Sequence, residues 1–111
     1  MEPCIFCKIA QHQLATDVLY EDQNILAFKD IAPKAPVHLL IIPKKHIATL
    51  NEVQDFHIMA QMMATAVQLA KQQQIAASGY RLLMNCNQQA GQEVFHIHLH
   101  LLGGKKLGSI G

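Results

Sequence analysis

Short stretches of alternating or continuous apolar residues divide the chain into strand-like segments separated by polar turns. Residues 17–21 precede a polar turn at 22–24, and a second apolar run follows the turn at once, which predicts a hairpin. Pro33 and Pro36 exclude regular structure between them, because proline removes a backbone donor and fixes the chain. The predicted strands cover residues 17–21, 25–29, 38–42, 80–85 and 94–102.

One long helix is predicted from apolar residues that recur at intervals of three and four. Asn51 or Asp55 is placed to cap its start, and Ser78 and Gly79 lie beyond its end. We assign its apolar stripe to core or dimer packing rather than to a methionine-rich binding groove. The stripe consists of Phe56, Met59, Ala60, Met63, Val67 and Ala70.

A shorter helical turn is predicted at residues 4–10, where Ile5, Phe6 and Ile9 have helical spacing. Together these elements predict the α+β class, with a five-stranded, mainly antiparallel sheet, one long helix and a short N-terminal helix. The 111 residues, without repeats or linkers, are expected to form a single domain over 1–111.

Composition narrows the possible partners. A formal net charge of +1 provides no basic stripe, so we expect no nucleic-acid partner. No apolar run approaches the roughly 20 residues that span a bilayer, so we expect no membrane association. The start of the chain lacks the features of a secretory signal, which predicts a cytoplasmic protein. In that compartment, the three cysteines of the chain indicate reduced thiols or a metal pair rather than a disulfide framework.

Histidine is the unusual component: three of the seven histidines fall within residues 96–100. Side chains two apart on a strand share one face at roughly 6.6–6.8 Å, so His96, His98 and His100 are predicted to line one face. Ile97, Leu99 and Leu101 would enter the core on the other. Three uses remain open from the residues alone: ligands of a catalytic metal, a nucleophile with its proton-managing neighbours, or a pH-sensitive structural cluster.

The alternating motif at 96–102 resembles the signature of the histidine triad (HIT) superfamily of nucleotide hydrolases and transferases. Segments at the family's order and spacing cover most of the chain; they lie at 26–31, 35–47, 79–81 and 91–95. The Leu-Leu-Gly-Gly sequence at 101–104 resembles the nucleoside phosphoramidase (HINT) branch, in particular its bacterial members. The resemblance implies a HIT-like fold and a homodimer.

The resemblance implies that His98 attacks the α-phosphorus of a nucleotide and forms a covalent nucleotidyl-histidine intermediate. A neutral imidazole is abundant at pH 7 and needs no prior deprotonation, which suits it to this step. In the family a main-chain carbonyl holds the second ring N–H of this histidine. His100 and His38 are implied to contact phosphate oxygens and to organise protons.

Nucleotide binding is also assigned by resemblance. Asn85 and the main-chain N–H groups of Glu93 and Val94 are implied to hold the phosphate, and Asp30 to accept the ribose hydroxyls. The alternative for Asp30 is a turn residue before Pro33. The implied purine slot and its border comprise Ile5, Phe6, Ile9, Phe28, Ile31 and Leu40. From the residues alone, the apolar members of the slot are better explained as ordinary core residues.

Glu93 departs from the pattern of the HINT branch, many of whose members have serine there to help protonate the leaving group. An ionised carboxylate repels a phosphate, so we expect the Glu93 side chain to turn away from it. The acid that protonates the leaving group is therefore not assigned.

Some bacterial HIT proteins hold a structural zinc, and the resemblance implies Cys4, Cys7, His46 and His96 as its ligands here. The alternative is a pair of free thiols beside a solvated histidine. No organic cofactor and no Mg²⁺ are expected. Cys86 is interpreted as a packing residue, and His12 and His57 receive no role.

The predicted function is hydrolysis of purine nucleoside 5′-phosphoramidates or related nucleotidyl conjugates. The alternatives are a dinucleoside polyphosphate hydrolase of the same superfamily, a metal-dependent hydrolase with the triad as zinc ligands, and a purine-nucleotide-binding module without catalysis.

Overall fold

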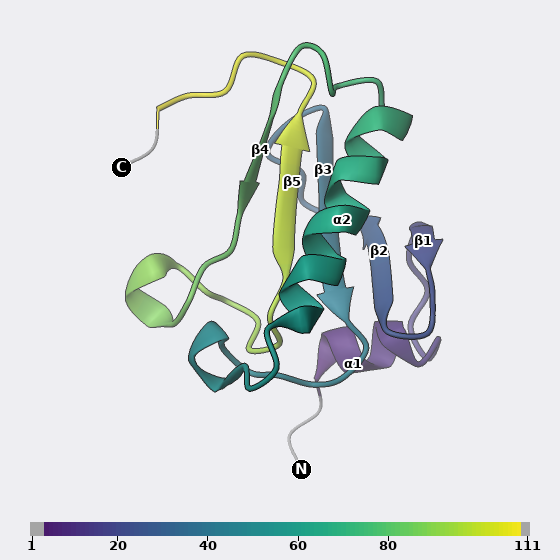
Figure 1. Cartoon of the computed structure of the whole chain (residues 1–111), viewed down its shortest axis with the longest axis vertical. Coiled ribbons are helices and arrows are strands. Elements are labelled where there is room, and N and C mark those ends of the chain that lie inside the picture. Colours follow the sequence, from purple (N-terminus) through teal and green to yellow (C-terminus); the bar gives the residue numbers. More distant parts are fainter. Residues whose placement is uncertain (1–3, 110–111) are drawn as a thin grey trace.

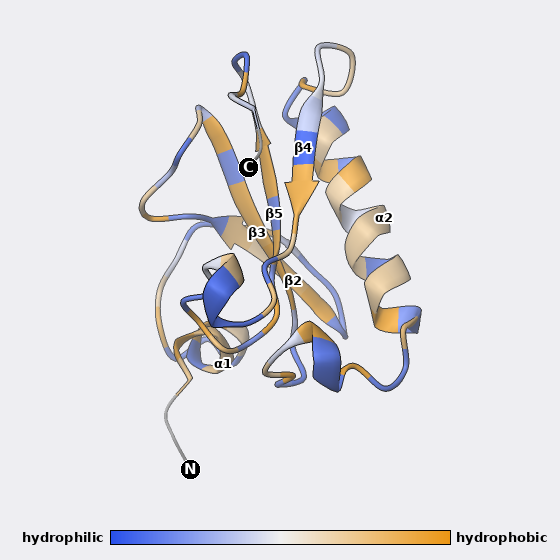
Figure 2. Cartoon of the chain, turned by 90° about the vertical axis from the view of Figure 1, so that its left-hand side faces the viewer, coloured by the Kyte–Doolittle hydropathy of each residue, from blue (hydrophilic) through white to orange (hydrophobic). Residues whose placement is uncertain are grey.

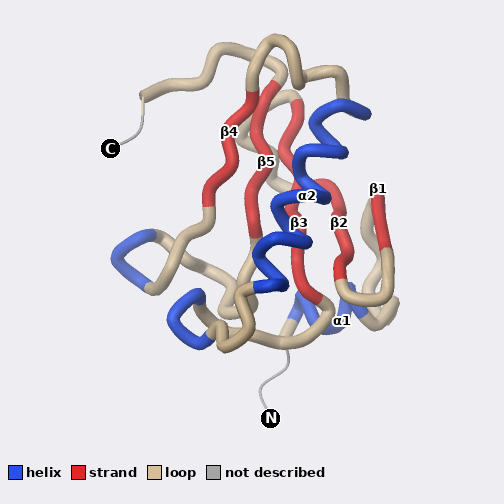
Figure 3. Tube along the Cα trace, viewed as in Figure 1, coloured by secondary structure: helices blue, strands red, loops and turns tan. Residues whose placement is uncertain are grey.

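The computed structural model describes residues 4–109, and its centre is one antiparallel sheet with the strand order β1-β2-β3-β5-β4 (Figures 1 and 3). The strands are β1 (Val18–Glu21), β2 (Ile25–Lys29), β3 (Val37–Pro43), β4 (Tyr80–Leu83) and β5 (Leu99–Gly103). The helices are α1 (Ile5–Ala10) and α2 (His57–Gln72), with 3-10 turns η1 (Leu50–Glu52) and η2 (Gln88–Ala90).

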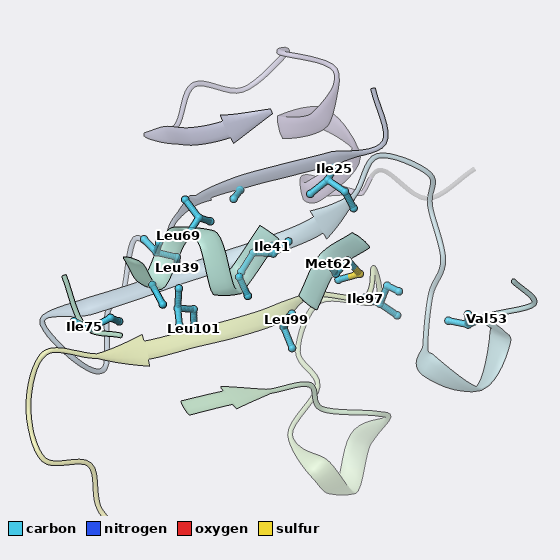
Figure 4. Packing of buried hydrophobic residues seen from close by; sticks show 13 residues of the cluster. Ile25, Leu39, Ile41, Val53, Met62, Leu69, Ile75, Ile97, Leu99 and Leu101 are labelled. Carbon is cyan, nitrogen blue, oxygen red and sulfur yellow. The ribbon is translucent and has the colours of Figure 1, made fainter. Parts of the chain in front are cut away.

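The two helices cover opposite faces of the sheet, so the central strands are buried on both sides (Figure 2). On the α2 side, alternate residues of β2, β3 and β5 pack against Met62 and Leu69 of the helix (Figure 4). On the other side, Phe6 and Ile9 of α1 pack against the intervening residues of β2 and β3. Burial on both faces explains why these strands are continuous apolar runs in the sequence.

The sheet and the fold class agree with the sequence prediction, but most of the apolar stripe predicted on the long helix lies outside the core of the chain. Four of its six members are exposed: Ala60, and with larger side chains Phe56 by 58%, Met63 by 45% and Val67 by 38%. The buried face consists instead of Met62, Thr65, Ala66, Leu69 and Ala70. This helix carries apolar residues on more than one face, so helical spacing fits two registers, and only the sheet selects between them.

The helix starts at His57, whose main-chain N–H donates to Asp55 Oδ1 at 3.0 Å. Asp55, rather than Asn51, therefore accepts a hydrogen bond from the first turn of the helix. It ends at Gln72, several residues before the predicted stop at Ser78 and Gly79. No helix among residues 4–109 has the length and apolar character needed to cross a membrane.

The last two strands are shorter than predicted. β5 begins at Leu99 instead of residue 94, and β4 ends at Leu83 instead of residue 85. The ladder between β3 and β5 stops at the Ile41–Leu99 pair, because β3 ends at Pro43, which has no N–H to donate. Alternation nevertheless persists through the irregular segment, since Ile97, Leu99 and Leu101 all enter the core on the α2 side.

Candidate active site and metal cluster

A cavity of about 810 Å³ opens on the α1 side of the sheet, where α1, the end of β2 and the segment before β5 meet. All the residues predicted to act in catalysis or nucleotide binding line it: Phe6, Ile9, Phe28, Asp30, Ile31, His38, Leu40, Asn85, Glu93, Val94, His98 and His100. Ile5, also part of the expected slot, lies at the same cavity. Residues separated by more than 90 positions in the sequence therefore share one hollow.

His98 is buried at the cavity, with 7% of its surface exposed. Its Nδ1 lies 2.8 Å from the main-chain carbonyl oxygen of His96. A carbonyl only accepts, so Nδ1 carries the proton and Nε2 keeps a free lone pair. The edge of the Phe6 ring packs against this imidazole, with the ring centroids 5.1 Å apart. The result is a fixed imidazole whose unprotonated nitrogen is available as a nucleophile.

His38 and His100 form a relay whose proton positions are set by one main-chain donor. The Lys34 N–H donates to His38 Nδ1 at 3.0 Å, so the His38 proton must be on Nε2. His38 Nε2 then donates to His100 Nδ1 at 2.9 Å, which leaves the His100 proton on Nε2. This buried Nε2 has no hydrogen-bond partner among the described residues. It is a free donor at the wall of the cavity.

Burial keeps this relay neutral. It lowers the pKa of His100 to about 4, and the neighbouring His98 and His38 add to the shift. Burial also lowers the pKa of His38; the Asp30 carboxylate, whose Oδ2 lies 3.4 Å from His38 Nε2, opposes that shift, and Lys34 adds to it. At pH 7 the His100 ring therefore donates through a neutral N–H.

Asp30 both closes a turn and lines the cavity. Its Oδ1 accepts the main-chain N–H of Ala32 at 2.8 Å, which closes the turn before Pro33. It also lines the cavity. Ordering of the turn therefore holds the carboxylate at the site.

The apolar wall of the cavity is part of the core as well. Phe6, Ile9, Phe28 and Leu40 are buried and belong to the cluster between α1 and the sheet. The Phe6 and Phe28 rings meet edge to face, with centroids 5.5 Å apart. Ile31, by contrast, is 93% exposed and lies at the border of the cavity. A flat ligand placed here would contact rigid, well-packed side chains.

The main-chain N–H groups of Glu93 and Val94 donate to no acceptor within residues 4–109, and both residues line the cavity. The exposed Glu93 carboxylate makes no hydrogen bond or ion pair with that part of the chain. Glu93 also borders a second groove beside Cys7 and His46. The expectation that its side chain turns away from the phosphate stays a prediction.

His96 belongs to a different cluster. The ligand atoms of Cys4, Cys7, His46 and His96 lie within 4.8 Å of one another. Cys4 Sγ is 3.3 Å from His96 Nδ1, and Cys7 Sγ is 3.3 Å from His46 Nδ1 and 3.5 Å from His96 Nδ1. Sulfur and nitrogen ligands on a tetrahedral zinc lie roughly 3.6 Å apart, from bond lengths of about 2.3 and 2.05 Å. The spacing fits such an ion.

The tautomer of His96 fits a metal too. Its Nε2 donates to the Pro43 carbonyl at 2.7 Å, so Nδ1, which faces both thiols, has a free lone pair. Burial lowers the pKa of His96 to about 4, which keeps the ring neutral. Burial and the Cys4 thiol raise the pKa of Cys7 to about 11, so metal binding must displace a proton there.

A second group of possible ligands, Asp30, His38 and His100, is less suited to a metal. The Lys34 N–H occupies His38 Nδ1 and places the proton on Nε2, the atom that would have to bind the ion. No group of possible metal ligands within residues 4–109 unites His96, His98 and His100. The geometry therefore does not support a catalytic metal held by the whole triad.

Comparison with known proteins agrees with this geometry. Residues 11–107 match the model of the HIT domain. The chain belongs to the HIT family. The purine nucleoside phosphoramidase of Escherichia coli (strain K12) is 49% identical over 109 residues, which cover 96% of this chain and 92% of that protein.

Solved structures of HIT proteins share the fold closely. The crystal structure of a HIT family hydrolase from Legionella pneumophila Philadelphia 1 matches with a TM-score of 0.93 and 54% identity over 96% of both chains. A histidine triad protein from Clostridium difficile matches with a TM-score of 0.95 and 40% identity over the whole of both. The predicted family and HIT-like fold are confirmed.

Three residues that shape this HIT site have no signal in the linear sequence. Lys34 acts through its main-chain N–H, which every residue except proline has, and Pro43 acts through its main-chain carbonyl, which every residue has. Gln92 acts through its side chain and bonds to Ala48, 44 positions away. Their partners become evident only when the tertiary contacts are known.

Proposed function

We propose that this HIT protein hydrolyses purine nucleoside 5′-phosphoramidates through a covalent intermediate on His98. The observation that carries the proposal is the bond from His98 Nδ1 to the His96 carbonyl, which exposes a nucleophilic Nε2 at the cavity. The 49% identical relative from Escherichia coli, named a purine nucleoside phosphoramidase, supports the substrate class.

In the first step, His98 Nε2 forms a bond to the α-phosphorus and the P–N bond breaks. The leaving amine takes its electron pair and acquires a proton from water. Because Nδ1 keeps its proton, the nucleotidyl-imidazole is cationic, and the His96 carbonyl stabilises that charge. We assign the phosphate oxygens to His100 Nε2–H, the Glu93 and Val94 N–H groups and Asn85; the unpartnered His100 Nε2 and the position of all four residues at the cavity support this assignment.

In the second step, water attacks phosphorus, the P–Nε2 bond breaks and the nucleoside monophosphate leaves. One proton from the water returns to solvent. The purine would lie against Phe6, Ile9, Phe28 and Leu40, with Ile31 at the border, and Asp30 would accept the ribose hydroxyls. This arrangement favours ribonucleotides.

Cys4, Cys7, His46 and His96 would hold a structural Zn²⁺. A bound ion supplies a cross-link between α1, the segment after β3 and the segment before β5. It would also fix the main chain at His96, whose carbonyl orients His98. We place the protein in the cytoplasm, where reducing conditions disfavour disulfides; Cys4, Cys7 and Cys86 form none.

We further infer a homodimer, because α2 leaves an apolar surface of Phe56, Met63 and Val67 exposed. Light scattering should give the mass of two chains for the wild type, and that of one chain for Met63→Lys. Gln68→Lys, the same change at an exposed polar position of α2, is the control and should remain dimeric. A monomeric wild type would contradict the inference.

The function is tested with adenosine 5′-phosphoramidate. The wild type should release AMP and His98→Ala should not. Rapid quenching in alkaline denaturant, in which a phosphorus–histidine bond survives, should trap a protein-bound adenylyl group in the wild type but not in His98→Ala. His57→Ala, an exposed histidine outside the cavity, is the matched control. Tight AMP binding without turnover would instead indicate the binding module, and faster cleavage of a diadenosine polyphosphate the alternative hydrolase.

A further inference from the structure

Gln92 is a buried polar residue with no part in the proposed reaction, and its side chain is fully engaged. The residue is 5% exposed. Its Nε2 donates to the Ala48 carbonyl at 2.8 Å and to the Val94 carbonyl at 3.0 Å. Its Oε1 accepts the Asn87 N–H at 2.7 Å. With two acceptors on one side and a donor on the other, the amide has only one acceptable orientation.

Asn87, one of these partners, has a backbone conformation that side chains rarely adopt. Its φ is 71° and its ψ is 179°, in a region that favours glycine. The Asn87 N–H donates to Gln92 Oε1, and the Asn87 carbonyl accepts the main-chain N–H groups of Gln92 and Ala90, each at 3.2 Å. Gln92 thus bonds both polar main-chain groups of the strained residue, and surrounding structure of this kind is what maintains such strain.

The two residues directly after Gln92 are those whose main-chain N–H groups we assign to the substrate phosphate. Glu93 and Val94 line the cavity, and their N–H groups have no acceptor within residues 4–109. The segment of Glu93 and Val94 is held before Glu93 by the hydrogen bonds between Gln92 and Asn87. It is held at Val94 by the bond from the Gln92 amide to the Val94 carbonyl. The third bond ties this segment to Ala48, on the connection that follows His46.

We propose that Gln92 is a positioning residue, whose side-chain amide holds the Glu93 and Val94 N–H groups in the orientation that binds the substrate phosphate. The proposal rests on the proposed function, since it concerns the same phosphate position. Free donors give most stabilisation when they are aimed before the substrate arrives, and a short segment clamped at both ends cannot reorient. Gln92 touches neither nucleotide nor nucleophile; it acts through its neighbours.

A purely structural role for Gln92 makes a different prediction. General loosening would weaken binding of any ligand in the cavity, including a nucleoside without phosphate. Misplaced phosphate donors would weaken AMP and leave adenosine unaffected, because adenosine contacts only the apolar wall and Asp30. The ratio of the two affinities separates the roles.

The test compares Gln92→Met with Gln89→Met. Methionine has a similar length and no charge, and Gln89 is an exposed residue of the same loop outside the cavity. Dissociation constants for AMP and adenosine are measured by calorimetry on the full chain, together with kcat and KM for adenosine 5′-phosphoramidate. For Gln92→Met we expect AMP affinity and kcat/KM to fall about 10-fold or more, with adenosine affinity within about twofold of the wild type. Gln89→Met should match the wild type throughout.

Unchanged AMP affinity in folded Gln92→Met, or an equal loss for AMP and adenosine, would overturn the proposal. If Gln92→Met does not fold, Gln92→Asn, which keeps the amide on a shorter side chain, is measured by the same criterion. A wild type that binds AMP but cleaves no phosphoramidate would refute the proposed function, while the AMP-to-adenosine ratio would still decide the role of Gln92.

Discussion

His96 and His98 are two residues apart, are both buried and are both neutral in the proposed roles. They differ in which ring nitrogen lacks a proton: Nδ1 in His96 and Nε2 in His98. His96 donates a hydrogen bond from Nε2 to the Pro43 carbonyl, and its Nδ1 faces two thiols. His98 donates a hydrogen bond from Nδ1 to the His96 carbonyl, which leaves Nε2 unprotonated at the cavity. In each case a main-chain carbonyl selects the tautomer, and the tautomer decides whether the ring suits a metal or a phosphorus atom.

The surroundings of the two rings differ as much as the tautomers. Around His96, two thiols and a second imidazole converge, a set that satisfies a tetrahedral ion and leaves no position open for substrate. Around His98, an aromatic edge, a neutral histidine relay and free N–H groups leave open space. The first arrangement suits stability and the second suits chemistry. The following predictions test that division.

The largest effect is expected from exchanging the His98 ring for an amide. His98→Asn should lower kcat/KM for adenosine 5′-phosphoramidate by at least about 10⁴-fold, because no other group at the cavity supplies a nucleophile. Thermal unfolding should show a melting temperature within a few degrees of the wild type. Residual hydrolysis within tenfold of the wild type would refute the division between the rings.

The same exchange at His96 should mainly reduce stability. His96→Asn keeps the main-chain carbonyl that orients His98 but removes a proposed zinc ligand. We expect loss of bound zinc, by elemental analysis, and a loss of about 4 kcal/mol of unfolding free energy, as for a ligand at 1,000 times its dissociation constant. Chelation of the wild type should have a similar effect, and chelation of His96→Asn none. Full zinc content in the variant would contradict the assignment.

A smaller effect is expected from pH. Burial lowers the pKa of His96 and His100 to about 4, from an ordinary value of 6.5. Between these values the unfolded chain binds protons that the folded chain does not, so stability decreases as the pH falls from 6.5 to 4. Allowing for solvent screening, we expect a loss of roughly 2 kcal/mol in urea unfolding.

His100→Asn removes one of these titrating groups, so its stability should depend less steeply on pH over this interval. Equal slopes for the variant and the wild type would contradict the assignment of this loss to the buried rings.

The smallest effect concerns Asp30, which lies at the cavity and not in the metal cluster. Asp30→Ala should raise KM for the ribonucleotide substrate about 10-fold and leave KM for the 2′-deoxy analogue nearly unchanged, as one lost charge-assisted bond implies. Asp17→Ala, a change of the same charge outside the cavity, is the control. A parallel rise for both substrates would show that Asp30 acts through the turn at Ala32 instead.

Much of the fold followed from the sequence, because burial on both faces leaves clear apolar runs in β2 and β3. The register of α2 did not, because Met63 and Val67 are as apolar as Met62 and Leu69, and only the position of the sheet distinguishes them. The length of β5 was overestimated for a related reason. Alternation continues through residues 94–98, but the pairing of β5 with β3 stops at Ile41 and Leu99, two residues before β3 ends at Pro43.

Alternation alone was enough to predict which residues share a face: Ile97, Leu99 and Leu101 enter the core on the α2 side, and the three histidines lie on the opposite face. The sequence also carried enough of the family pattern to mark the residues that line the cavity. Only the tertiary structure decided which nitrogen of each histidine is free. That choice depends on a hydrogen-bond partner, and the partners at His38 and His96 are main-chain atoms of Lys34 and Pro43, which become neighbours of those rings through the fold. Identical side chains therefore acquired different chemistry from the backbone around them.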